Sequence, residues 1–213
     1  MTSRFIARTP VQERSRNRVS LILQTAEALL VEVGLGDFSI PLLAERLDSP
    51  RATIYKFFPT PYALLNALAE QHLAALELTL QEQAMLELQA RTEMGWREGT
   101  RNMISNAAAY YRQHPAACIL LLGGHATDDS FRAMEYTITC LGRLTRHMLQ
   151  HARITLRSSA PDECALAIEF GTTCFRVSYL LHKDITPEYV EAGADAMIAF
   201  IEKRAGLSPE PGA

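Results

Sequence analysis

The sequence lacks several patterns that would assign it at once to a class of protein. Its four cysteines, Cys118, Cys140, Cys164 and Cys174, form no C-x-x-C pair. No uninterrupted apolar run approaches the roughly 20 residues that a membrane-spanning helix needs. The arginines near the N-terminus precede no apolar segment, so a signal peptide is not indicated. These absences predict a cytoplasmic protein without membrane contact, whose cysteines are buried small apolar residues; a thiol-based redox sensor is the alternative.

Motifs of common enzyme classes are also missing. There is no G-x-S-x-G and no P-loop, and GLGDFS at 34–39 lacks the third glycine of a dinucleotide loop. None of the six histidines has a Glu three residues before it, which argues against a helical di-iron site. His147 and His151 have the spacing of a shared metal site but lack the Glu of H-E-x-x-H, so an interaction with a helix dipole is favoured. We expect no catalytic activity, no cofactor and no metal.

The charge of -3 is unevenly distributed over the 213 residues. Residues 1–60 hold eight Arg or Lys against six Asp or Glu, a balance of +2, and the remainder holds 13 against 18, a balance of -5. The first 20 residues contain five arginines and one acid, Glu13. A flexible basic arm over residues 1–11 is therefore expected, which either meets a polyanion or is simply solvated.

Apolar residues recur with a helical period along almost the whole chain. The first stripe predicts a helix over 12–33, ended by Gly34 and Gly36. Ser39 is the expected N-cap of a second helix to about residue 47, and Ser49 with Pro50 begins a third. A fourth helix begins at Pro61, and five more patterns cover 94–112, 115–123, 130–152, 161–182 and 187–204. No strand alternation competes with them, so the fold class is all-α, with about nine helices.

The short third helix has two different faces. Ile54, Phe57 and Phe58 lie on one side, and the opposite side carries Arg51, Ala52, Tyr55 and Lys56. Because so short a helix is marginal alone, a core beneath must hold it and leave the polar side free. This favours a helix-turn-helix, with Arg51 near a guanine edge and Thr53, Tyr55 and Lys56 near phosphates. An ordinary helical hairpin with a basic face is the alternative.

The order Ser39, Leu43, Ala44, Thr53, Ile54, Tyr55, Phe58 and Leu64 resembles the DNA-binding domain of TetR-family transcriptional regulators. The family pattern T-x-x-x-I-A-x-x-A-G-V-S-x-x-T-x-Y-x-x-F-x-x-K-x-x-L matches from Ser39 to Leu64 without a gap. Two departures are Asp48-Ser49-Pro50 in place of Gly-Val-Ser and Pro61 in place of the lysine that typically touches a phosphate. The DNA-binding residues that we expect are Arg14, Ser39, Arg51, Ala52, Thr53, Tyr55 and Lys56.

The resemblance implies a three-helix head over 12–60 and a larger ligand-binding and dimerisation domain over 61–206. We expect a disordered tail over 207–213. It implies a homodimer that binds a palindromic double-stranded operator, most commonly a repressor that a small-molecule effector releases. A helical small-molecule-binding protein without operator-specific DNA binding is the alternative.

Two sets of residues are candidates in the larger domain. Bulky and adaptable side chains that suit a largely apolar ligand are Trp96, Met103, Tyr110, Met134, Phe170 and Cys174. Residues expected at a four-helix interface between subunits are Ile168, Gly171, Phe175, Tyr179, Ala196 and Phe200. Periodicity also permits both sets to face the core of one subunit.

Overall fold

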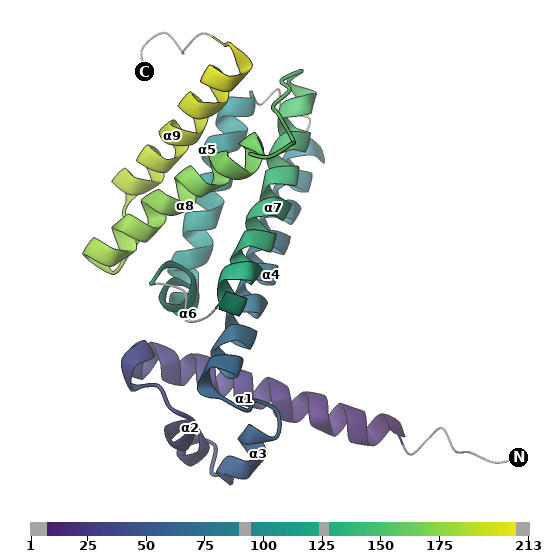
Figure 1. The fold of residues 1–213 in the computed structure, drawn as a ribbon, viewed down its shortest axis with the longest axis vertical. Coiled ribbons are helices and arrows are strands. Elements are labelled where there is room, and N and C mark those ends of the chain that lie inside the picture. Colours follow the sequence, from purple (N-terminus) through teal and green to yellow (C-terminus); the bar gives the residue numbers. More distant parts are fainter. Residues whose placement is uncertain (1–7, 90–94, 124–127, 208–213) are drawn as a thin grey trace, which may run out of the picture. The chain divides into compact units, whose positions relative to one another are not determined.

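The computed structural model describes residues 8–89, 95–123 and 128–207. Within these ranges the protein is helical without a strand, as predicted (Figure 1). The chain forms two compact units, Met1–Leu68 and Ala69–Ala213, and the division falls inside a long helix. Residues 1–7 of the predicted arm and 208–213 of the predicted tail lie outside the described residues.

The first unit contains the three N-terminal helices that the sequence predicts. Helix α1 spans Arg8–Asp37 and contains one non-helical residue, Gly34, at φ 75° and ψ 173°. Helices α2 (Ile40–Arg46) and α3 (Arg51–Tyr55) follow, and α4 (Pro61–Gln89) begins in this unit. The fully buried apolar side chains of these helices form one core: Ile22, Leu29, Leu30, Ile40, Leu43, Ile54 and Leu64.

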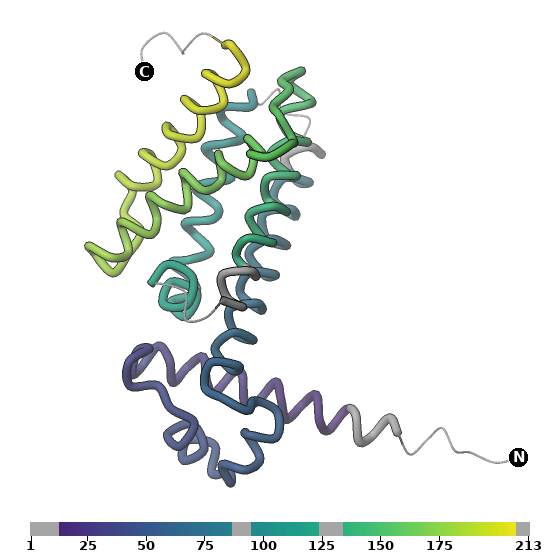
Figure 2. The backbone as a smooth tube through the Cα atoms, viewed as in Figure 1, coloured from purple at the N-terminus to yellow at the C-terminus, as the bar shows by residue number. Residues whose placement is uncertain are grey.

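The second unit is a bundle of longer helices. It contains the rest of α4, α5 (Trp96–Gln113), α6 (Pro115–Ala117), α7 (Asp128–His151), α8 (Glu163–His182) and α9 (Pro187–Ala205). Helix α8 packs on α7 and α9, and α5 packs on α9 and α7 (Figure 2). Among the four cysteines, Cys118, Cys140 and Cys164 are buried and Cys174 is half-buried.

The segment 115–123, which was predicted to be one helix, is wound differently in the structure. A single turn, α6, continues as the π-helix η1 (Cys118–Leu122). The N–H of Gly123 donates to the carbonyl of Cys118 at 3.0 Å, five residues back. A Cβ on Gly123 would lie 2.6 Å from the carbonyl oxygen of Ile119. The wider turn therefore depends on the missing side chain at this position.

Helices α8 and α9 form a hairpin whose loop is tied to α8. The hydroxyl of Ser178, which is fully buried, donates to the carbonyl of Asp184 at 2.8 Å and accepts from the N–H of Thr186 at 3.0 Å. Lys183 ends α8 in the left-handed conformation, at φ 57°. The turn is thus held by a buried polar group with both partners supplied locally.

Two described helical segments, Glu13–Asp37 and Glu163–His182, are long and apolar enough to cross a membrane by length and composition alone. The core helix of a soluble protein passes the same test. The first segment supplies buried residues to the head, and the second packs between α7 and α9. Their apolar character has an explanation inside the fold.

Candidate DNA-binding face and ligand cavity

Helix α3 separates its residues as the sequence predicts. Ile54 is fully buried and Phe58 is nearly so, which anchors the five-residue helix to the core of the first unit. Arg51, Ala52, Tyr55 and Lys56 are exposed, and Thr53 is half-buried. The exposed set presents a guanidinium, a phenol and an ammonium group on one rigid turn, which suits contacts to a polyanion.

The turn between α2 and α3 closes through backbone bonds. The N–H of Ser49 donates to the carbonyl of Ala44 at 3.0 Å, and that of Asp48 donates to the carbonyl of Glu45 at 3.1 Å. These two bonds form a Schellman motif in which Asp48 occupies the left-handed position, at φ 45°. Glycine is the residue that this position favours, and it is the residue that the TetR pattern has there.

Two of the predicted DNA-binding residues lie outside α3. The hydroxyl of Ser39 accepts from the N–H of Leu42 at 3.4 Å and caps α2, as the sequence predicts. Arg14 is exposed on α1. At the start of α4, the hydroxyl of Thr60 accepts from the N–H of Ala63 at 3.0 Å, so the helix is capped beside Pro61. Ser39 and Thr60 thus fix the helix ends on either side of α3.

A cavity of about 330 Å³ opens among α4, α5 and α7 in the second unit. Of the residues predicted to bind a ligand, Trp96 and Met103 line this cavity, and Tyr110, Met134, Phe170 and Cys174 do not. The remaining apolar wall comes mainly from Leu80, Ala84, Leu144 and Met148. Its size and composition lie within the range of small-molecule sites.

Polar residues that were not predicted to bind a ligand also line the cavity. They are Gln83, Asn106, Thr145, His147 and His151. The rings of His147 and His151 lie 4.6 Å apart, and Nδ1 of His151 is 2.8 Å from the carbonyl oxygen of His147. Their spacing of four residues was visible in the sequence, but the wall that they complete comes from distant helices.

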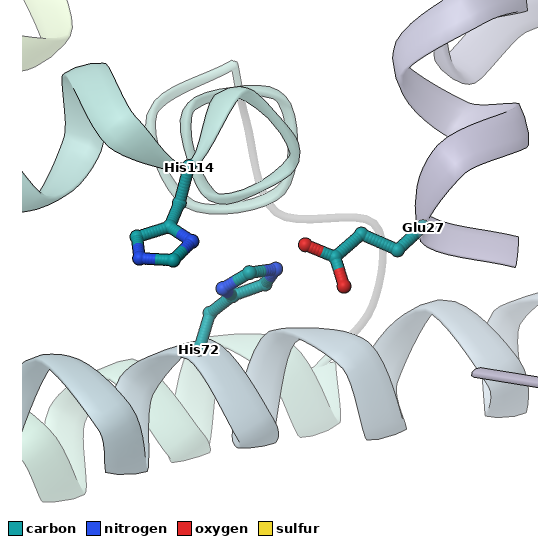
Figure 3. Close-up of side chains that lie close together, drawn as sticks. All are labelled: Glu27, His72 and His114. Atoms are coloured by element: carbon teal, nitrogen blue, oxygen red, sulfur yellow. The ribbon is translucent and has the colours of Figure 1, made fainter. Parts of the chain in front are cut away.

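Tyr110 belongs to a buried aromatic group rather than to the cavity. Its hydroxyl donates to the carbonyl of His72 at 3.1 Å, and Nδ1 of His72 lies 3.1 Å from the same hydroxyl. The ring of Tyr110 stacks on that of His114, with centroids 4.3 Å apart. His72 and His114 lie side by side, with ring centroids 5.8 Å apart (Figure 3). Met134, on α7, is buried without lining the cavity.

One face of α8 carries three of the residues that were predicted to lie at the interface between subunits. Ile168, Gly171 and Phe175 are buried within the chain's own second unit. A Cβ on Gly171 would lie 2.5 Å from Cδ1 of Ile104 and 3.0 Å from Sδ of Met197. These residues of α8 therefore pack against α5 and α9 of the same chain.

The opposite face of α8 carries a stripe of less buried residues. Phe170, Val177 and Leu181 are exposed, Cys174 between them is half-buried, and burial raises the pKa of its thiol. Phe200 on α9 packs on Phe170 with ring centroids 5.0 Å apart. Tyr179 and Ala196 are half-buried. The stripe follows the spacing i, i+4, i+7, i+11 and forms one apolar surface.

The fold defines a class of protein in which a small N-terminal unit with a helix-turn-helix is followed by a larger helical unit that contains a cavity. Residues 22–68 match the family described as "Bacterial regulatory proteins, tetR family". The match covers the helix-turn-helix of the first unit, and the whole chain has the fold of TetR-family transcriptional regulators. No curated protein matches the sequence.

Solved structures of low sequence identity share this fold. A TetR-family transcriptional regulator from Streptomyces coelicolor superposes with a TM-score of 0.66 at 21% identity, covering 88% of this chain and 99% of that one. A TetR transcriptional regulator from Rhodococcus sp. RHA1 gives 0.61 at 16% identity, covering 89% and 97%. A TetR variant from Acinetobacter baumannii AYE in complex with minocycline gives 0.55 at 18% identity, covering 86% and 96%.

Proposed function

We propose that this protein is a cytoplasmic, ligand-responsive transcriptional repressor that binds a palindromic operator as a homodimer and is released by a small effector. The family match and the fold support a DNA-binding regulator. The observation that carries the proposal is that Ile54 of α3 is a buried anchor, whereas Arg51, Tyr55 and the C-cap residue Lys56 form an exposed row. A helix held in this way is suited to enter a major groove.

The DNA contacts divide into two kinds. Arg51 lies in the first turn of α3, where a side chain can reach guanine O6 and N7 and choose a base. Tyr55 and Lys56 are expected to hold phosphates, which strengthens binding to all sequences alike. Arg14 on α1 is expected to add a further phosphate contact, and the helix caps at Ser39 and Thr60 fix the position of α3.

The test uses duplexes selected from a random pool, with affinity measured by fluorescence anisotropy over a range of salt concentrations. We expect a steep fall of affinity with salt, because several phosphate contacts release counterions. Tyr55→Phe combined with Lys56→Ala should weaken selected and unselected duplexes equally. Arg51→Ala should relax the choice at one base by about 1–3 kcal/mol. Arg112→Ala, which removes an exposed arginine of α5, is the matched control and should change neither quantity.

A flat salt response would refute the electrostatic part of the proposal. Loss of affinity in the Arg51→Ala variant without any change in base preference would refute its assignment as the reading residue. If no duplex is enriched from the pool while the cavity still binds a small molecule, the alternative holds. The protein would then be a helical small-molecule-binding protein without operator-specific DNA binding, which the cavity alone would also permit.

The homodimer rests on the exposed apolar stripe of α8. Phe170, Val177 and Leu181 are 40%, 39% and 65% exposed, and an apolar surface of this kind on a soluble protein indicates a partner. One head covers a single half-site, so a palindromic operator requires two heads related by a two-fold axis. A second copy of the α8–α9 surface is the partner that satisfies both conditions.

Light scattering of the free protein should therefore give the mass of a dimer at micromolar concentration. Leu181→Asp places a charge in the stripe and should give a folded monomer with unchanged helical circular dichroism. Met85→Asp is the control, because Met85 is 55% exposed on another helix, and it should leave the dimer intact. A dimer that survives the Leu181→Asp change would place the interface elsewhere.

A further inference from the structure

The contacts between α5 and α7 show how the cavity is oriented. Sδ of Met148 lies 2.8 Å from the position that a Cβ would take on Gly99. One turn further along α5, Sδ of Met103 lies 3.7 Å from the hydroxyl of Thr145, one turn back along α7. The two helices are thus antiparallel at the cavity. The N-terminal end of α5 consequently lies at the level of the last turn of α7.

These two helix ends form a polar end of the cavity. Gly95 is the N-cap of α5 and lines the cavity, and no side-chain hydrogen bond caps this helix within the described residues. Because Gly95 and Trp96 both line the cavity, the partial positive charge at the N-terminus of this 18-residue helix lies at the cavity wall. His151 lines the same end from the last turn of α7 and His147 from the turn before it, and both side chains are exposed.

The C-terminal carbonyls of α7 also lie near this end and would repel an anion. Two of the last four are engaged by the chain itself. The carbonyl of Leu149 accepts from the N–H of Ile154 and that of Gln150 accepts from the N–H of Arg153, each at 2.9 Å. The carbonyl of His147 accepts from Nδ1 of His151. This last bond places the proton of a neutral His151 ring on Nδ1 and leaves Nε2 as a proton acceptor.

The rest of the cavity is long, mainly apolar and uncharged, with polar side chains from Gln83, Asn106 and Thr145. It extends along α5 from Gly95 to Asn106, a rise of about 16 Å at the helical repeat. Its walls are mainly Leu80, Met103, Leu144 and Met148, with the edge of the polar end formed by Trp96. Among its described lining residues there is no Asp, Glu, Lys or Arg. A cationic ligand would find no counter-charge, and a compact polar ligand would leave most of the wall unused.

We propose that the ligand of this cavity is an elongated apolar molecule that ends in a single carboxylic acid. The acid end meets the first N–H groups of α5 and the imidazoles of His147 and His151, and the apolar chain lies between Met103 and Leu144. The acid and Nε2 of His151 share one proton in a charge-assisted hydrogen bond, and the pair carries no net charge. This inference rests on the proposed function only in taking the cavity as the effector site.

The chain offers a direct probe of occupancy, because Trp96 is its only tryptophan and lies in the cavity wall. Tryptophan fluorescence of the full-length protein is titrated with decanoic acid, decanamide and decylamine, which share one apolar chain and differ in the terminal group. Isothermal titration calorimetry checks each dissociation constant. We expect decanoic acid to bind at least ten times more tightly than decanamide, because charge-assisted hydrogen bonds are the stronger ones. Decylamine should bind most weakly.

Two variants separate the acid end from the apolar wall. His147→Phe combined with His151→Phe keeps the ring volumes and removes the nitrogens, so the preference for acid over amide should fall to about that of the helix end alone. His182→Phe, at the exposed end of α8, is the control and should keep the full preference. Gly99→Ala pushes the flexible side chain of Met148 into the cavity and should weaken acid and amide by the same factor.

Equal affinities for acid and amide would overturn the proposal and leave the cavity as an apolar effector site. Absence of binding for all three compounds would overturn it as well. The effector role is judged separately, by the affinity of the selected duplex with and without decanoic acid. If the acid binds tightly and the DNA affinity is unchanged, the proposed ligand class holds, but the acid does not release the protein from DNA.

Discussion

Asp48 gives a sharp test of the helix-turn-helix geometry, because it combines an unfavourable backbone conformation with an unfavourable charge. It has φ 45° at the left-handed position of the Schellman motif, a conformation that costs a residue with a Cβ roughly 1–2 kcal/mol, and Asp less than most. Asp48→Gly removes this cost but makes the unfolded chain more flexible, which offsets about 0.5–1 kcal/mol. We therefore expect a net gain of at most about 0.5–1 kcal/mol in the free energy of unfolding.

The same substitution acts on DNA through charge. Asp48 precedes Arg51 by three residues, so on a duplex bound by α3 we expect its carboxylate to lie within a Debye length, about 10 Å, of a phosphate. Removing it should raise the affinity for the selected duplex several-fold. Asp48→Asn separates the two effects, since asparagine also tolerates the left-handed conformation and carries no charge. It should raise the DNA affinity as much as Asp48→Gly and add little stability.

The measurements are urea unfolding followed by circular dichroism, and anisotropy with the selected duplex at one salt concentration. If Asp48→Gly leaves the unfolding free energy unchanged or lowers it, the assigned backbone conformation is wrong. If Asp48→Asn matches Asp48→Gly in stability, charge rather than backbone strain is responsible. A DNA affinity that neither variant alters would place Asp48 away from the bound duplex.

Three further predictions concern capping, packing and pH. Ser39→Ala should lower the free energy of unfolding by about 1 kcal/mol in urea titrations, and Ser39→Gly by only a few tenths. An unchanged free energy in the alanine variant would show that the hydroxyl does not stabilise α2. Gly171→Ala should cost about 1–3 kcal/mol because its Cβ overlaps neighbouring side chains, whereas Gly36→Ala, with open space around it, should be tolerated; equal effects would contradict the packing. Burial raises the pKa of the Cys118 and Cys164 thiols from 9.0 to about 11, mainly through desolvation. The unfolded chain then releases these protons at lower pH than the folded chain, so the free energy of unfolding should fall as pH rises from 9 to 11. The fall should be weaker when Cys118→Ala and Cys164→Ala are combined. If this variant shows the same pH dependence, the two thiols are not its cause.

The helices and the face of α3 were predictable from sequence because they depend on local signals. Caps such as Ser39, the breaker Gly34 and the spacing of Ile54 from Phe58 each act within a few residues. The winding at η1 was not predictable in this way. The need for glycine at position 123 arises from the carbonyl of Ile119, whose approach appears only in three dimensions.

Assignment of the faces of α8 and of the cavity wall required tertiary contacts. Helix α8 is apolar on both sides, with Phe175 on one and Val177 on the other, so its period does not decide which side faces inward. The close approach of Met197 to Gly171 decides it. The cavity likewise joins residues of α4, α5 and α7, and only the antiparallel register of the last two brings His151 to the level of Trp96.

The contact between Gly99 and Met148 has a consequence for how this protein can diversify. The width of the cavity at this level depends on one missing methyl group and on a long, adaptable side chain that can move aside. Substitutions at either position would alter which molecules enter while leaving the buried core of the head untouched. Descendants of this chain can therefore acquire new ligands by single steps that cost little stability, and the DNA-binding unit need not change with them.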